Sequence, residues 1–543
     1  MPKKMIIALV LTLFTAFQAG GCDSIEPGGC LDQALLQEPS MLNPLLLKED
    51  CAVTDYIFQG LVGFDEHLQL VGQLAESWEV SPDNREWTFV LRKDVSWHDG
   101  QPFTAADVEF TYALHVFDEN FPGPRDKDLA AIEAIDVIDD YRIRFLLAPG
   151  HELSMAKMAL KILPRHLYDP QVALGRDRVP TGEMASHPRN WRPVGTGPFC
   201  FAQWQNQCII LQRNEQYYDG DGPYIETIKF NFYPDLDTAL SDLAAGRVDL
   251  LEDITPAQMA AAPDLSHTHN YFTYREMGCQ VLAFNFHGDA VPWQDLRVRQ
   301  AIAFALDRER MILELLGGRG VPVEGIIPSQ SWACAQDITG YSRDLAQAGK
   351  LLDEAGWLPD QEGWRCQAGK RLALKLTFRE DHPIYWRLAA LIQEDLARVG
   401  IEANLDPRPW NDLLLNCVQG GNFELLLLGL SVDPDPSVAL YSSKSISRGM
   451  NLGGYTSSDL ESLLSVDVMA EDFASRQLAY GAMQKLMSRD LPYIFLFSPL
   501  RTAIADKDLM GIVVSPLGLQ CQERWHLVGD SKDSLGEPLR NEH

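Results

Sequence analysis

Two carboxylates, Asp433 and Asp435, directly follow a short apolar run. Leu425 to Leu428 form that run, whose length suits a strand buried on both faces of a parallel sheet, although a buried helical turn gives the same pattern. Gly429 ends the run, and the prolines of the Asp-Pro-Asp-Pro sequence forbid helix or ladder afterwards. Because ligands in open α/β sheets bind beyond the carboxyl ends of strands, the pair is a candidate ligand anchor. The alternative is a solvated turn, since Asp and Pro are common turn formers.

Strands and helices alternate around this run. We expect helices over 384–399 and 412–417 and strands over 401–405 and 493–497. Apolar residues recur at helical spacing in the first of these helices, and Gly400 closes it. Strand-helix-strand units imply right-handed crossovers and a parallel sheet. The sequence therefore predicts an α/β fold for this part of the chain.

The segment from 74 to 108 has a different pattern. Residues 75–80 and 87–92 predict two strands joined by a turn, and Asp99-Gly100 predicts a second tight turn. Thr104 and Asp107 then form a capping box that starts a helix. Another hairpin is expected over 135–145.

The length and the net charge of the chain limit the kinds of protein that it can be. The chain has 543 residues, enough for about three domain-sized units. Its net charge of −30 makes the surface acidic, and an acidic surface repels phosphate backbones. We therefore expect no nucleic-acid partner.

The first 21 residues predict a signal peptide. Lys3 and Lys4 precede an apolar stretch, residues 5–17, that is short for a membrane span. The small residues before Cys22 resemble a bacterial lipobox, with Ala19 where such boxes usually have Leu. This implies cleavage before Cys22 and lipidation of its thiol, with plain secretion as the alternative. No later apolar run is long enough to cross a bilayer.

The other cysteines predict a disulfide rather than a metal site. An exported chain meets an oxidising compartment, and Cys200 and Cys208 could face each other across a hairpin. No CxxC pair suggests a zinc ribbon, and His267 with His269 is more typical of a surface strand than of a metal site. We expect neither a metal nor a cofactor.

Catalytic motifs are absent from the sequence. It contains no G-x-S-x-G elbow, no H-E-x-x-H and no Walker loop. The chain is therefore expected not to be an enzyme, with a secreted hydrolase as the alternative from another functional class.

Two sequence stretches closely resemble the signature of the family 5 extracellular solute-binding proteins, the dipeptide- and oligopeptide-binding lipoproteins of ABC importers. They are LAESWEVSPDN at 74–84 and WTFVLRKDVSWHDGQPFTAADV at 87–108. Further pieces are similar in the same order, so that the resemblance covers essentially the whole mature chain: 37–44, 195–199, Asn285, 295–302, 355–357, Asn451 and Tyr455.

The resemblance implies a periplasmic-binding-protein-like fold, in which two lobes close like a hinged clamp and an extra domain is inserted in the first lobe. Lobe I is expected to hold residues 22–55, 195–282 and 498–543, the inserted domain residues 56–194, and lobe II residues 283–497. It further implies a monomer in the periplasm or at the cell surface, anchored through Cys22, that delivers solute to an ABC permease.

The resemblance also implies site residues. Peptide binders of the family hold the ligand's α-ammonium with an Asp four residues after the Gly of this strand, and Gly429 and Asp433 match that spacing. Weaker candidates are Glu38, Trp410, Asp435, Asn451 and Tyr455. Packing is the alternative role for Trp410 and Tyr455, and a turn is the alternative for Asn451.

The ligand class stays open at this point. Cys417 and Leu427 stand where well-known oligopeptide binders carry Arg, and Leu430 replaces a common Trp. Peptides are the expected ligands, and a non-peptide solute such as nickel, haem, an opine or an oligosaccharide is the alternative on the same fold.

Overall fold

A computed structural model describes residues 26–49, 51–149, 153–168, 184–220, 222–287, 291–436, 451–469 and 473–528. The predicted signal peptide and Cys22 lie outside these ranges. Within them, no helix is both long and apolar enough to cross a membrane.

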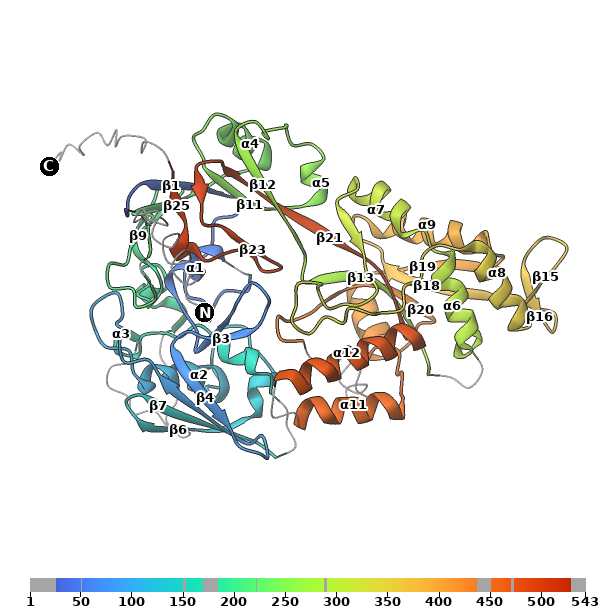
Figure 1. The fold of residues 1–543 in the computed structure, drawn as a ribbon, viewed down its shortest axis with the longest axis horizontal. Helices are drawn as coiled ribbons and strands as arrows, with labels where there is room; N and C mark the ends of the chain where they lie inside the picture. Colours follow the sequence, from blue (N-terminus) through green and yellow to red (C-terminus); the bar gives the residue numbers. More distant parts are fainter. Residues whose placement is uncertain are drawn as a thin grey trace, which may run out of the picture.

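One large mixed sheet runs through the molecule (Figure 1). Its main path through the described residues is β19-β18-β20-β13-β21-β11-β1-β10-β9-β8, and β12 and β14 pair with β21 beside this path. The strands are β1 (Cys30–Leu35), β8 (Phe199–Gln205), β9 (Cys208–Arg213), β10 (Thr227–Phe232), β11 (Leu250–Ile254), β12 (His269–Arg275), β13 (Gly278–Phe284), β14 (Gly320–Pro322), β18 (Ala373–Arg379), β19 (Glu402–Arg408), β20 (Leu425–Ser431) and β21 (Tyr493–Asp506).

The long strand β21 joins two lobes. Its second half pairs with β11 and β12 of lobe I, and its first half pairs with β13 and β14 of lobe II. Figure 1 shows it passing from one lobe to the other. The chain also crosses between β12 and β13, and this crossing lies beside β21, because Ser498 Oγ donates to Gly278 O at 2.6 Å. The two crossings therefore form a narrow two-stranded connection, the geometry of a hinge.

Lobe II buries its part of the sheet on both faces. One face is covered by α6 (Leu296–Ala305), α7 (Arg308–Leu316), α8 (Leu345–Glu354) and α9 (Tyr385–Ala397), and α12 (Phe473–Asp490) contributes to the core on the other face, beside α11 (Ser458–Met469). Leu425 and Leu427 belong to the first core and Leu426 to the second, and all three are fully buried. The predicted buried strand is confirmed.

This strand differs from the prediction in two respects. β20 is parallel to β18 but antiparallel to β13, so the sheet is mixed. The strand also continues past Gly429 to Ser431, because β13 pairs with it as far as Gly278. Pairing with β13 therefore extends the strand past Gly429, where the sequence pattern predicts its end.

The inserted segment has its own sheet, β4-β5-β7-β6. These strands are β4 (Ala75–Val80), β5 (Glu86–Leu91), β6 (Ile132–Asp139) and β7 (Arg142–Leu147), covered by α2 (Ala105–Phe117). Both predicted hairpin regions are thus strands. Asp107 accepts from the Thr104 backbone N–H at 3.0 Å, as the predicted capping box requires.

A hairpin from this domain reaches into lobe II. Its strands are β2 (Val62–Phe64) and β3 (Leu70–Gly72), and Leu68 at the tip is fully buried in the lobe II core that contains Trp332. The Trp332 backbone N–H donates to His67 O at 3.0 Å. Leu68 adopts a φ of 60°, which is costly for a branched side chain, so burial of the side chain must offset that cost.

The predicted Cys200–Cys208 disulfide does not form in this structure, where both residues are free thiols. They do lie on neighbouring strands, β8 and β9. However, the register places Cys208 opposite Gln205 and Cys200 opposite Gln212. A two-residue turn at Asn206 and Gln207 sets this register, which the sequence alone did not reveal.

The remaining elements are short. The helices are α1 (Ala52–Ile57), α3 (Arg165–Tyr168), α4 (Leu236–Ala244), α5 (Pro256–Met259) and α10 (Trp410–Asp412). The strands of small separate sheets are β15 (Leu358–Pro359), β16 (Arg365–Gln367), β17 (Lys370–Arg371), β22 (Leu509–Met510), β23 (Val513–Ser515), β24 (Gly518–Gln520) and β25 (His526–Leu527).

Candidate ligand-binding site

The carboxyl ends of three strands lie side by side at one end of the lobe II sheet, which we name the Asp433 edge. β18 runs parallel to both β19 and β20, so Arg379, Arg408 and the residues after Gly429 share that edge. Just past β20, the Val432 backbone N–H donates to Met277 O at 3.0 Å. Met277 lies at the crossing between the lobes, so this edge of lobe II borders lobe I.

Asp433 is exposed at this edge. Its side chain retains 56% of its accessible surface, and its one charged neighbour among the described residues is Lys157, with Nζ at 3.8 Å. Lys157 is held more closely by Asp126, at 2.9 Å, and also by Asp128 at 3.4 Å. Burial opposes the charge of Lys157, but these carboxylates outweigh it and raise its pKa. Asp433 is therefore only weakly neutralised and available to a ligand cation.

Asp435 has the opposite environment. Its carboxylate is buried, accepts from Ser154 Oγ at 2.8 Å and pairs with Arg476 at 3.1 Å. Ser154 belongs to the inserted domain and Arg476 to α12. In this structure Asp435 joins the two lobes rather than offering oxygen atoms to a ligand.

Trp410 lies at the same strand edge as Asp433. It begins the short helix after β19 and keeps 45% of its surface exposed. The guanidinium carbon of Arg379 lies 5.0 Å from its ring centroid, a cation–π arrangement. Arg379 also pairs with Asp381. Sequence analysis missed Arg379, which is the last residue of β18.

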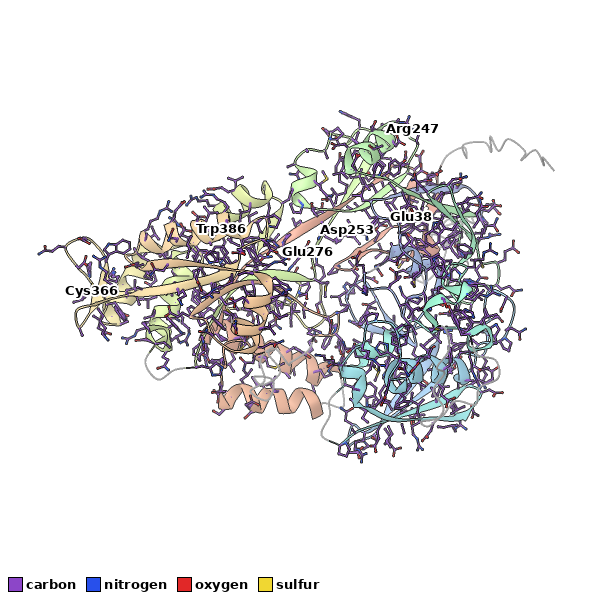
Figure 2. The ribbon with its side chains drawn as sticks, turned by 180° about the vertical axis from the view of Figure 1, so that it is seen from behind. Glu38, Arg247, Asp253, Glu276, Cys366 and Trp386 are labelled. Carbon is purple, nitrogen blue, oxygen red and sulfur yellow. The ribbon has the colours of Figure 1, made fainter. Side chains whose placement is uncertain are left out.

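A large cavity opens on the lobe I side of the same border. Its volume is about 1420 Å³, and Glu276 and Met277 form its edge at the crossing. Glu38 also lines it and accepts from Trp204 Nε1 at 3.0 Å. Figure 2 shows Glu38, Asp253 and Glu276 on the lobe I side, with Trp386 on lobe II. Glu38 thus belongs to the lobe I cavity, whereas Asp433 and Trp410 lie in lobe II.

Asn451 and Tyr455 lie away from this group. The Phe286 backbone N–H donates to Gly453 O at 2.7 Å, and Phe286 follows the end of β13. Because β13 is antiparallel to β20, this is the opposite edge of the sheet. The structure does not bring these two candidates together with Asp433.

Both side chains make structural contacts there. Asn451 Nδ2 donates to Tyr455 O at 2.7 Å, and the Tyr455 hydroxyl donates to Asp490 at 2.6 Å. Burial, with the Asp490 carboxylate, raises the pKa of Tyr455 to about 12. These contacts match the turn and packing roles that were the alternatives.

Comparison with known proteins decides the family. The family model "Bacterial extracellular solute-binding proteins, family 5 Middle" matches residues 69–451. The chain belongs to this family.

Similar family 5 proteins cover almost the whole chain. "Oligopeptide-binding protein AppA" of Bacillus subtilis (strain 168) is 26% identical over 517 residues, covering 92% of both chains. "Dipeptide-binding protein" of Escherichia coli (strain K12) is 26% identical over 485 residues, covering 83% of this chain and 85% of the relative.

Solved structures show the same fold. The structure of AppA from Bacillus subtilis in complex with a nonapeptide has a TM-score of 0.64 at 25% identity and covers 93% of this chain and all of that one. HbpA2 from Haemophilus parasuis has a TM-score of 0.78 at 22% identity, covering 92% of this chain and 100% of that one. The predicted periplasmic-binding-protein-like fold is confirmed. The family binds solutes, so the chain is a binding protein, and the hydrolase alternative is dropped.

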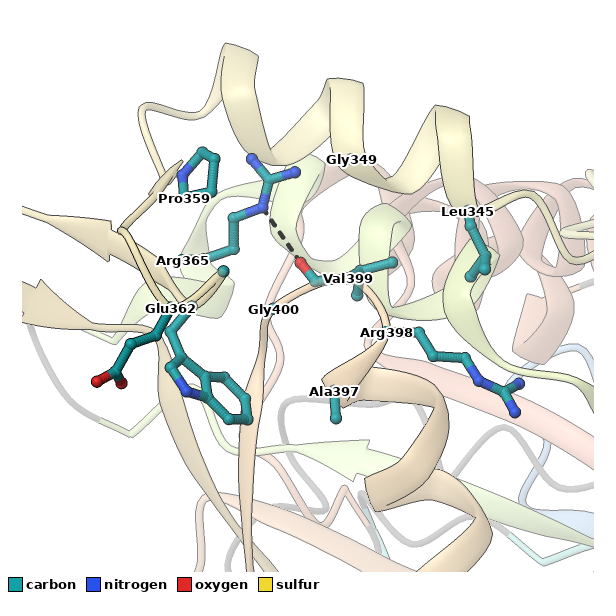
Figure 3. A pocket seen from close by; sticks show the side chains of 11 residues that line it. Leu345, Gly349, Pro359, Glu362, Arg365, Ala397, Arg398, Val399 and Gly400 are labelled. Carbon is teal, nitrogen blue, oxygen red and sulfur yellow. Dashed lines mark hydrogen bonds between the residues drawn. The ribbon is translucent and has the colours of Figure 1, made fainter.

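A second cavity of this family 5 protein, about 340 Å³, lies near the amino end of β19 (Figure 3). Arg365 dominates it, but its guanidinium already donates to Val399 O at 3.1 Å and to Trp357 O at 3.0 Å. It also pairs with Asp353. This cavity is remote from the Asp433 edge, and the less exposed of its two arginines, Arg365, is committed to the fold.

Among the residues that the structure describes, no three His, Cys, Asp or Glu side chains form a group that could hold a metal ion.

Proposed function

We propose that this family 5 protein captures peptides outside the cytoplasm and delivers them to an ABC permease. The observation that carries the proposal is the exposed, weakly neutralised carboxylate of Asp433 at the strand edge, beside a cavity of about 1420 Å³. The names of the two curated relatives, an oligopeptide-binding and a dipeptide-binding protein, support the ligand class.

In the proposed complex, Asp433 pairs with the α-ammonium of the peptide. A carboxylate that exchanges water for a paired cation gains a charge-assisted hydrogen bond on closure. Trp410 offers an apolar face to the ligand, and Arg379 supplies a cation at the same edge for a carboxylate or carbonyl group. Glu38 closes on the ligand from lobe I.

The test removes the negative charge of Asp433, the proposed anchor. Asp433→Asn keeps the shape and removes the charge, so tripeptides with a free amine should bind roughly ten- to a hundredfold more weakly in calorimetric titration. N-acetylated tripeptides, which lack the ammonium, should bind both forms equally. Asp337→Asn is the matched control, since the Asp337 side chain is 89% exposed and its charged neighbour is Lys485 of α12. Equal affinity of free-amine peptides for Asp433→Asn and the parent protein would discard the anchor role.

We also propose where the protein acts and in which oligomeric state. The protein acts as a monomer in the periplasm or at the cell surface, held to the membrane by lipid on Cys22. The basic, apolar and small residues of segment 1–22 support the location and the anchor. Cys22→Ser should release the protein into the soluble extracytoplasmic fraction, and retention of the variant on membranes would contradict the anchor.

A non-peptide solute is the second candidate. Cys417 and Leu427, which stand where Arg is expected in well-known oligopeptide binders, are buried in the two lobe II cores and supply no cation for a peptide carboxylate. "Heme-binding protein A" of Haemophilus influenzae is also similar, at 25% identity over 511 residues. Haem or a nickel chelate that binds more tightly than any peptide would favour this candidate.

A further inference from the structure

The large lobe I cavity has more carboxylates than cations along its walls. Negative charge therefore predominates inside it, as it does over the whole chain. The carboxylates are Glu38, Glu49, Asp55, Glu252, Asp253 and Glu276, and the cations are Lys48, Lys161 and Arg501.

Two of the three cations are already paired. Lys161 binds Asp55 and donates to Thr54 Oγ1 at 3.0 Å. Arg501 pairs with Glu276 and, at 3.5 Å, with Asp253. These pairs leave other carboxylates without a counter-charge inside the cavity.

Glu252 is the most enclosed of these. It is partly buried on β11 and accepts from Gln33 Nε2 at 2.7 Å. In the part of the chain that the structure describes, no Lys or Arg lies within ion-pair distance of it. Burial raises the pKa of Glu252 to about 7.

A buried amide oxygen of another residue that lines the cavity has no hydrogen-bond partner within the described part of the chain. Gln59 is only 7% exposed, and its Nε2 donates to Tyr217 OH at 2.9 Å. Its Oε1 has no hydrogen-bond partner among the described residues. A buried amide oxygen left unpaired is costly, and a rotation of the Gln59 side chain toward a ligand that donates N–H groups would satisfy it.

These two observations point to one ligand chemistry. Glu252 and the Oε1 end of Gln59 are both acceptors, and a carboxylate far from any cation favours a positive partner. The cavity exceeds the roughly 300–1000 Å³ of ordinary small-ligand sites, so it has room for a long side chain.

We propose that the lobe I cavity receives a cationic side chain of the bound peptide, an amine or a guanidinium, with Glu252 as its counter-charge. This inference rests on the proposed peptide function and adds a side-chain preference to it. Gln59 supplies a neutral acceptor in the same cavity.

The test compares two peptides that differ in one charge. Ala-Lys-Ala and Ala-(Nε-acetyl-Lys)-Ala are titrated calorimetrically at pH 8, where Glu252 is ionised. The lysine peptide should bind roughly tenfold or more tightly to the parent protein. Glu252→Gln should abolish this preference, and Glu252→Asp should retain part of it. Glu215→Gln is the control, because Glu215 is 80% exposed on lobe I and does not line the cavity.

The outcomes separate the inference from the function on which it rests. Equal binding of the two peptides to the parent protein overturns the inference and leaves peptide capture intact. A preference that survives in Glu252→Gln also overturns it. If neither peptide nor any other peptide binds, the proposed function fails as well. The comparison within the parent protein needs no variant to fold.

Discussion

At the scale of single residues, neighbours in sequence can have opposite roles. Asp433 and Asp435 are two positions apart, yet one is exposed at the strand edge and the other is buried between Ser154 and Arg476. The Asp-Pro-Asp-Pro sequence gives both the same local character. The difference comes from residues far away in the chain, so local pattern alone could not separate anchor from lobe contact.

Glu252 provides a pH prediction at this scale. Its pKa rises from 4.5 to about 7 on folding, so the folded protein retains a proton that the unfolded chain has lost. The contribution of Glu252 to stability should therefore be full below pH 4.5 and should be lost as the pH rises through about 7. Glu252→Gln removes this dependence and should be more stable than the parent protein at pH 8, by at most about 3 kcal/mol.

Urea unfolding at pH 4.5, 6 and 8 measures this effect. The groups that act on Glu252 are Gln33, Asp253, Asp55 and the Leu519 backbone N–H, none of which the variant changes. The gap between variant and parent should widen with pH. A gap of the same size at all three values would show that Glu252 does not titrate as described.

At the scale of elements, the hairpin of β2 and β3 makes the most testable contact. Leu68 is fully buried in the lobe II core although it belongs to the inserted domain. Leu68→Ala should cost about 2–5 kcal/mol in the free energy of unfolding, the usual range for a buried leucine. Val71→Ala on β3 is the matched control, since Val71 is 38% exposed and should change stability by less than about 0.5 kcal/mol.

Denaturant titration of both variants gives the comparison. Similar midpoints for Leu68→Ala and Val71→Ala would mean that the hairpin tip contributes little to holding the inserted domain on lobe II.

The sequence predicted which segments form strands and helices better than it predicted which strands pair with each other. Four consecutive leucines at 425–428 and the capping box at 104–107 carry strong local signals, and both elements formed where expected. The pairing of β13 with β20 carried no such signal, so the extension of β20 to Ser431 was missed. The Cys200–Cys208 prediction failed for the same reason, since a shift in register changes which side chains face each other.

The ligand-binding site likewise has parts that the sequence predicted and parts that depend on the fold. The position of Asp433 beyond a buried strand was readable from sequence. The lobe I cavity was not, because its walls come from segments spread between residues 33 and 522. The separation of Asn451 and Tyr455 from Asp433 depends on the direction of β13, which only the folded sheet reveals.

At the scale of the whole molecule, two adjacent strand crossings connect the lobes. One lies between Arg275 and Gly278 and the other within β21. Arg275 is buried beside them and donates to Ile326 O at 3.1 Å and Ile327 O at 3.2 Å, which fixes a lobe II loop against the crossing. Such a connection allows the lobes to rotate about a short axis.

Saturating peptide should therefore make the molecule more compact. Small-angle X-ray scattering should show a smaller radius of gyration with Ala-Lys-Ala than without it. Ligand at a hundredfold above its Kd should also stabilise the fold by about 2.7 kcal/mol. Full binding by calorimetry with an unchanged radius would contradict lobe closure.

The central claim is that this family 5 protein captures peptides at the Asp433 edge. Mass spectrometry of the ligand that the protein retains through purification from its native host tests it most directly. The account predicts short peptides with free amino termini, enriched in lysine or arginine, that are lost from Asp433→Asn. A haem, a nickel chelate or a sugar retained equally by the parent protein and the variant would contradict it.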